Sequence, residues 1–121
     1  MRIAVVAALC LVLTACGDNP GDDAAQAACR AYAKNPVSLT ENADLRTTAA
    51  REAQRAAEAD DAYAALPQDM DDAWSRMDAM ASAHNSGHEV SGTDLDAYFA
   101  ADRRVRTDCA DAGAELGPLE P

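Results

Sequence analysis

Two histidines, His84 and His88, are the side chains of this 121-residue chain best suited to catalysis or metal binding. His88 and Glu89 match the start of the zinc-protease pattern His-Glu-x-x-His, in which two histidines one helical turn apart bind the metal. Gly92 stands where the second histidine is required. Ser91 lacks the glycine spacing of a hydrolase nucleophile, Gly-x-Ser-x-Gly. Because these partner groups are missing, we expect no catalytic residue and no enzymatic activity.

A second arrangement of side chains has the chemistry to bind copper. Met77 and Met80 share one face of an expected helix, and His84 and His88 follow it. Thioether and imidazole groups are suitable ligands for Cu(I). The methionines would serve equally well as flexible packing residues against Trp74 in a helical core. Since a methionine that faces inward is not an open ligand, the sequence favours packing and no cofactor. A copper or small-ligand site of the envelope, formed by the two methionines and two histidines, is the alternative.

The N-terminal segment has the layout of a bacterial export signal. Met1 and Arg2 supply a short positive end, and residues 3–13 form an almost unbroken apolar run. This run is shorter than the about 20 apolar residues that a membrane-spanning helix needs. A turn-forming segment, residues 17–21, follows and ends any helix there. We therefore expect residues 1–15 to be a cleaved signal peptide.

The end of this segment, Leu13-Thr14-Ala15-Cys16, resembles the lipobox of bacterial lipoproteins. In that family a leucine and two small residues precede a cysteine, and the signal is cut before the cysteine. The resemblance, which covers residues 1–16, implies cleavage between Ala15 and Cys16, a thioether-linked lipid on Cys16, and usually an acyl chain such as palmitate on the new amino group. Two or three chains anchor a protein stably, whereas one binds marginally. The implied location is the extracytoplasmic face of the cell membrane.

Two further cysteines, Cys29 and Cys109, remain in the mature part of the chain. An even pair in an exported protein is typical of a disulfide bond, because the compartments outside the cytoplasm are oxidising. The alternative, two separately buried thiols, is less typical of that location. A bond closing so long a loop would stabilise the fold by about 4 kcal/mol in the chain-entropy model. That is a large part of the stability of a small domain.

The charge of the chain limits the classes of partner. The formal net charge is −11 at pH 7, from 21 acidic and 10 basic residues. Because no basic stripe is present to neutralise phosphates, we expect no nucleic-acid partner. Anionic membrane surfaces attract basic rather than acidic segments. We therefore expect the lipid, and not the protein surface, to hold this protein at the membrane.

Apolar residues recur at three- and four-residue steps across an expected helical domain, residues 24–116. Turn signals divide the domain into helices over about 24–34, 39–65, 68–84 and 94–112. Short connections favour antiparallel neighbours. In such a bundle the first helix lies beside the last, which brings the two mature cysteines together. The sequence therefore predicts an all-α, up-down-up-down four-helix bundle closed by one disulfide bond.

Residues 16–23 are the expected lipidated tether, and residues 117–121 the expected frayed tail. The expected N-caps are Asp22 or Asp23, Ser38 and Thr93; Gly113 or the pair Gly117-Pro118 is expected to end the last helix. The expected inner stripes are Ala25, Ala28, Cys29 and Tyr32; Leu45, Ala49, Ala53, Ala56, Tyr63 and Leu66; Met70, Ala73, Trp74, Met77, Met80 and Ala81; and Leu95, Tyr98, Phe99, Val105, Cys109 and Ala112. Asp102 interrupts the last stripe, and Arg106 one turn later is its expected partner.

Tyr98 and Phe99 are adjacent and cannot both face fully inward, so we expect them to form an exposed patch that binds a partner. The chain as a whole resembles small alanine-rich helical lipoproteins of the envelope of high-GC Gram-positive bacteria. The lipobox, the helical pattern and the paired cysteines carry this resemblance, which transfers no functional residue. The expected function is a membrane-anchored, non-enzymatic interaction module with an envelope protein as its partner.

Overall fold

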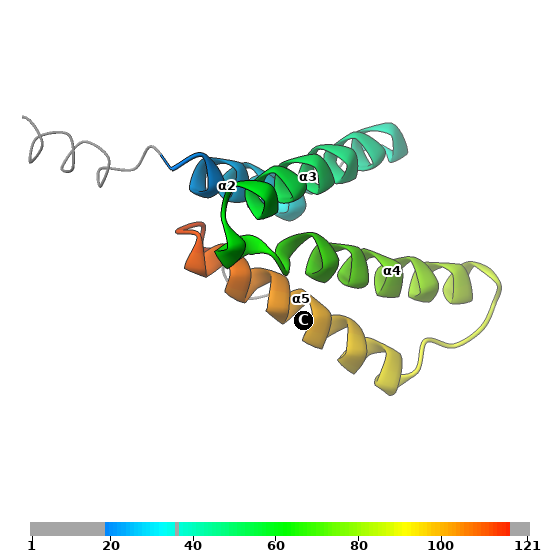
Figure 1. The fold of residues 1–121 in the computed structure, drawn as a ribbon. Coiled ribbons are helices and arrows are strands. Elements are labelled where there is room, and N and C mark those ends of the chain that lie inside the picture. Colours follow the sequence, from blue (N-terminus) through cyan, green and yellow to red (C-terminus); the bar gives the residue numbers. More distant parts are fainter. Residues whose placement is uncertain (1–18, 36, 117–121) are drawn as a thin grey trace, which may run out of the picture.

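The computed structural model describes residues 19–35 and 37–116. Its elements are helices α2 (Pro20–Ala33) and α3 (Leu39–Ala59), the 3₁₀ turn η1 (Asp61–Tyr63), and helices α4 (Leu66–Asn85) and α5 (Gly92–Asp111). Helices α2 and α3 form one antiparallel hairpin and α4 and α5 form the other (Figure 1). The hairpins pack through α3 on α4 and α2 on α5. The predicted all-α, up-down-up-down bundle is confirmed.

Several sequence predictions concern residues outside this description. The expected signal peptide, residues 1–15, the lipidation site Cys16 and the expected tail, residues 117–121, all lie there. Among the helices that the structure describes, none combines the length and the apolar character needed to cross a membrane.

Helix α2 begins earlier than expected. Asn19 is its N-cap, and the Asn19 side chain accepts a hydrogen bond from the Gly21 N–H at 2.9 Å. Pro20 suits the first turn, where its missing N–H costs little. Residues 20–23, which we assigned to the tether, are therefore helical, and the expected cap at Asp22 or Asp23 was wrong.

Helix α3 is shorter than expected and ends at Ala59. Its start is as expected, since the Ser38 hydroxyl accepts a hydrogen bond from the Glu41 N–H at 3.0 Å. At the other end, Asp60 has extended backbone and its carboxylate accepts a hydrogen bond from the Ala62 N–H at 2.9 Å. An aspartate that bonds its own neighbouring backbone competes with the helix. The resulting bend leads the chain from the first hairpin into the second.

The ends of α5 also depend on local side chains. Ser91, rather than the expected Thr93, caps this helix, because the Ser91 hydroxyl accepts a hydrogen bond from the Asp94 N–H at 3.1 Å. Gly113 follows the last turn with a φ of 85°. This left-handed conformation favours glycine and ends a helix. The expected stop at Gly113 is confirmed.

The core is small and made mostly of alanine, with Leu66 and Met70 as its largest fully buried apolar side chains. Tyr32 and Trp74 pack against it and are half-buried. Two residues of the expected inner stripes are exposed, Ala81 and Leu95. Helix α2 has 14 residues, whereas α4 and α5 have 20 each. The far ends of the longer hairpin therefore extend beyond α2 and bury less surface.

Cys29 of α2 and Cys109 of α5 form the predicted disulfide bond, with their Cα atoms 5.8 Å apart. Both cysteines are fully buried in the core. The bond joins the first and last described helices, which otherwise share a short line of contact. It thus closes the bundle as the antiparallel order of the helices predicts.

Candidate functional site

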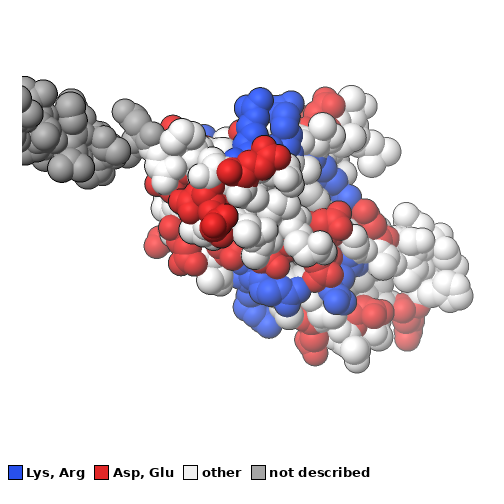
Figure 2. Space-filling view, viewed as in Figure 1, with Lys and Arg blue, Asp and Glu red and all other residues white. Residues whose placement is uncertain are grey.

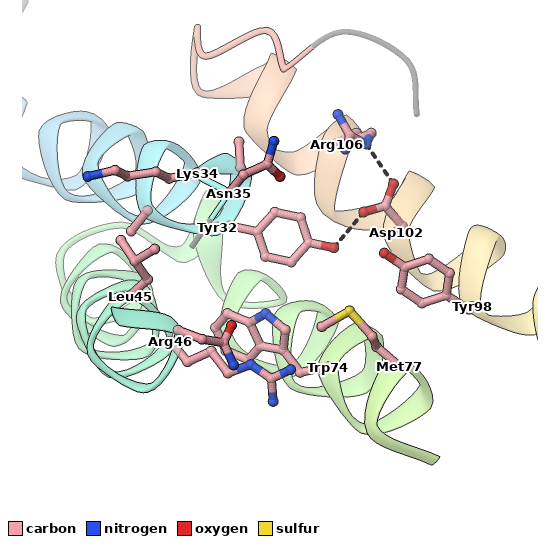
Figure 3. Close-up of a pocket in the computed structure, with 13 residues that line it drawn as sticks. Tyr32, Lys34, Asn35, Leu45, Arg46, Trp74, Met77, Tyr98, Asp102 and Arg106 are labelled. Atoms are coloured by element: carbon pink, nitrogen blue, oxygen red, sulfur yellow. Dashed lines mark hydrogen bonds and ion pairs between the residues drawn. The ribbon is translucent and has the colours of Figure 1, made fainter. Parts of the chain in front are cut away.

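A cavity of about 180 Å³ lies between the two hairpins (Figure 3). Its walls come from the end of α2, the first half of α3, and the middle of α4 and α5. It is lined by the aromatic residues Tyr32, Trp74 and Tyr98 and by the charged residues Lys34, Arg46, Asp102 and Arg106. The cavity forms where α2 ends, because the three longer helices continue past it.

A buried carboxylate, Asp102, forms the polar wall of this cavity. Only 2% of its surface is exposed. The Tyr32 hydroxyl donates a hydrogen bond to Asp102 Oδ1 at 2.6 Å, and Arg106 Nε donates one to Oδ2, also at 2.6 Å. Arg106 Nη1 further donates to the Leu116 carbonyl at 3.2 Å. The predicted pairing of Asp102 with Arg106 is confirmed, and Tyr32 is an additional partner from another helix.

The two tyrosine hydroxyls at the cavity keep their protons at neutral pH. Burial raises the pKa of Tyr32, and the hydrogen bond to Asp102 is the second cause. Burial also raises the pKa of Tyr98, with the negative charge of Asp102 as the second cause. The Tyr32 hydroxyl already donates its hydrogen bond to Asp102. Tyr98 has no hydrogen-bond partner among the described residues and is therefore a spare donor.

Arg46 occupies the opposite wall, beside Trp74. Its guanidinium carbon lies 5.7 Å from the centroid of the Trp74 ring, within range of a cation–π contact. Nη1 and Nη2 donate to the Asp78 carboxylate at 2.8 and 2.9 Å. Arg46 Nε is buried and has no hydrogen-bond partner among the described residues. A buried N–H left in this state lowers stability.

The predicted interaction patch lies partly at this cavity. Tyr98 and Phe99 are both half-buried, and their ring centroids are 5.5 Å apart. Tyr98 lines the cavity, with its hydroxyl on the side of Asp102 (Figure 3). At least one of the two adjacent aromatic residues thus borders the opening between the hairpins.

The residues of the alternative copper site fall in separate places. His84 and His88 are exposed and line a shallow hollow at the loop between α4 and α5. Met77 lines the central cavity instead, and Met80 is half-buried. Within residues 19–35 and 37–116, no cluster of three or more His, Cys, Asp or Glu side chains has the geometry to hold a metal ion. The two histidines therefore line the same hollow, whereas Met77 lines a different one.

A second titratable cluster joins α4 to α5. Burial raises the pKa of Asp108 to about 7, and the neighbouring carboxyl of Asp69 is the next cause. Asp108 Oδ2 is buried without a hydrogen-bond partner among the described residues. Arg104 lies 3.7 Å from Asp69 and 2.6 Å from Asp72, which leaves Asp108 without an ion pair of its own in the described chain. Asp108 is therefore a carboxyl group that folding favours in its protonated form.

We expect Asp108→Asn to stabilise the protein at pH 8 and to change its stability little at pH 4. The folded-state pKa of about 7 lies above the ordinary value of 3.8. The contribution of Asp108 is thus fully present below pH 3.8 and is lost as the pH rises through 7. Asparagine is uncharged at every pH, so the variant does not lose stability over this range. Because this site is partly exposed, we expect a gain of only about 1 kcal/mol at pH 8.

Urea unfolding of both proteins between pH 4 and pH 8 measures this difference. Asp96→Asn, an exposed position on the same helix, is the matched control and should show no such trend. An equal effect of Asp108→Asn at both ends of the pH range would contradict the assignment.

Comparison of the chain with protein-family models, curated proteins and solved structures gave no match.

Proposed function

We propose that this protein is a lipoprotein of the cell membrane whose helical domain is a non-enzymatic binding module on the extracytoplasmic face. The disulfide bond between Cys29 and Cys109 is the observation that carries the proposal. Such bonds persist in oxidising compartments and are rare in the cytoplasm. The bond and the lipobox ending at Cys16 are independent features that favour the same location.

The position of α2 supports a domain held near the bilayer. Four residues from Cys16 to Pro20 span at most about 14 Å. Helix α2 has 14 residues and is therefore about 21 Å long. The cavity is lined by the last turn of this helix, so it lies at the end of α2 remote from the proposed anchor. A partner or ligand would reach it from the side of the envelope.

The chemistry of the cavity supports binding rather than catalysis. Short hydrogen bonds from the Tyr32 hydroxyl and Arg106 Nε occupy both carboxylate oxygens of Asp102. The remaining lining groups are aromatic rings, aliphatic side chains, two asparagine amides and the cations Lys34 and Arg46. Basic and acidic side chains lie beside one another over the face in Figure 2 instead of forming a continuous basic surface, which supports an envelope partner over nucleic acid.

Replacement of the lipidated cysteine tests the anchor. We expect Cys16→Ser to abolish incorporation of labelled palmitate when the full chain is expressed in a bacterium that processes lipoproteins, because serine has no thiol to form the thioether. The matched control is Cys10→Ser, in the apolar run six residues earlier, which should be labelled like the unaltered protein. Equal labelling of the Cys16→Ser protein would refute the proposed address.

A further inference from the structure

We propose that the cavity between the hairpins binds a small aromatic carboxylate, a molecule with one ring and a carboxylate group. This inference rests on the proposed binding role and names the class of ligand for it. Three features of the cavity carry it: spare hydrogen-bond donors, a charged lining with more cations than anions, and half-buried aromatic rings.

The spare donors are Arg46 Nε and the Tyr98 hydroxyl. Arg46 lines the cavity, and its Nε is buried with no hydrogen-bond partner among the described residues, so a ligand reaches Nε when the Arg46 side chain moves. The Tyr98 hydroxyl has no such partner either and borders the cavity from the opposite hairpin. The acceptor that borders the cavity, Asp102, already receives two hydrogen bonds. The other side-chain amides on the lining, Asn35 and Asn42, each carry donors as well as an acceptor, so a ligand with a carboxylate supplies acceptors for the donors that remain.

The charged side chains that line the cavity are mostly basic, unlike those of the whole chain. Its charged lining comprises three cations, Lys34, Arg46 and Arg106, and a single anion, Asp102, whereas the full chain has a net charge of −11. Lys34 points away from the centre and lies 3.9 Å from Glu41, so it belongs to the rim (Figure 3). Arg46 is the cation best placed to contact an anion inside.

The aromatic lining selects a flat group. The rings of Tyr32 and Trp74 have their centroids 5.8 Å apart and are both half-buried, so part of each ring remains open. A ligand ring can pack against these faces in offset or edge-to-face geometry. The cavity volume of about 180 Å³ is below the roughly 300–1,000 Å³ of sites for drug-sized ligands. A single ring with a short acidic group is the size that this space suits.

Asp78 is the internal competitor for the proposed ligand. Its carboxylate takes Nη1 and Nη2 of Arg46, yet 62% of the Asp78 side chain is exposed. Exposed ion pairs are weak and exchange readily. A ligand carboxylate at Arg46 would therefore bind more tightly once the charge of Asp78 is removed.

Fluorescence of Trp74, the single tryptophan of the chain, reports on this cavity directly. We would titrate the full protein, purified in a non-ionic detergent, with phenylacetate and with its neutral analogue phenylacetamide. We expect a saturable change with phenylacetate and a much weaker one with phenylacetamide. Arg46→Gln should weaken phenylacetate binding by about tenfold, as for loss of a charge-assisted hydrogen bond. Asp78→Asn should strengthen it.

Arg51→Gln is the matched control, since Arg51 is exposed on the same helix and, among the described residues, pairs only with the adjacent Glu52. Its affinity should equal that of the unaltered protein. Equal titrations for Arg46→Gln and Arg51→Gln, or a response that does not saturate, would overturn the proposal. If Arg46→Gln fails to fold, Asp78→Asn decides the matter, because unfolding does not tighten binding; unchanged or weaker binding then overturns it.

The two proposals fail separately. Palmitate labelling that depends on Cys16, without phenylacetate binding, contradicts the proposed ligand and supports the proposed lipid-anchored module. Phenylacetate binding that depends on Arg46, together with palmitate labelling of the Cys16→Ser protein, supports the proposed ligand and contradicts the proposed lipid anchor.

Discussion

Removal of the disulfide bond by replacing Cys29 and Cys109 with alanine is expected to lower the free energy of unfolding by about 4 kcal/mol. The bond joins residues 80 positions apart, so its loss frees a long loop in the unfolded chain. The native bundle has little to compensate for this loss, because most of its fully buried side chains are alanines. Urea unfolding of the double variant and of the oxidised protein measures the difference.

The same experiment with a reductant supplies the control. The reduced, unaltered protein should unfold near the midpoint of the double variant, and its denaturant slope should rise because the unfolded chain exposes more surface. If the reduced and oxidised proteins unfold at the same midpoint, the bond does not stabilise the bundle and this explanation is wrong.

Asp102→Ala is expected to cost about 3 kcal/mol of stability at neutral pH. Asp102 is 2% exposed and holds the ends of two other side chains, the Tyr32 hydroxyl and Arg106 Nε. Removing one partner of a buried ion pair leaves the other charge without compensation, and this penalty exceeds the value of the hydrogen bonds alone. Chemical unfolding of the variant measures the loss.

Two further variants separate this network from general effects of substitution. Asp96→Ala, at an exposed position of the same helix, should change stability by no more than about 0.5 kcal/mol. In a double-mutant cycle, Asp102→Ala should cost less in a Tyr32→Phe background, because one of its hydrogen bonds is already absent. A cost of Asp102→Ala equal to that of Asp96→Ala would contradict the buried network.

The fold could be predicted because its two main signals are strong at the level of sequence. The apolar period of residues 24–116 is helical throughout, and short connections make neighbouring helices antiparallel. That order alone places Cys29 of the first described helix beside Cys109 of the last. The exact boundaries were less predictable, because at Asn19, Asp60 and Ser91 a single side chain captures a backbone N–H and sets where a helix begins or ends.

The candidate site was predictable only in part. The inner stripes already included Tyr32, Trp74 and Tyr98, since aromatic residues at helical spacing face a core. Arg46 was missed, because it adjoins the stripe at Leu45 and becomes a cavity wall only where the short α2 has ended. The sequence offered one signal for Arg46: it is a polar residue next to the inner-stripe residue Leu45, on a helix that continues past the end of the first one.

The carboxyl pair of Asp69 and Asp108 had no comparable signal. These residues lie on different helices, and their approach depends on how far α4 slides against α5. Sequence spacing predicts which face of a helix a residue occupies, but it does not predict that register.

Intact mass spectrometry of the protein extracted from membranes tests the central claim, a lipid-bearing Cys16 that anchors a disulfide-closed helical domain. We expect the mass of residues 16–121 plus a diacylglyceryl group and an acyl chain, and an increase by two hydrogen atoms after denaturation in reductant. The mass of the unprocessed, unmodified chain would contradict the anchor, and an unchanged mass after reduction would contradict the bond between Cys29 and Cys109.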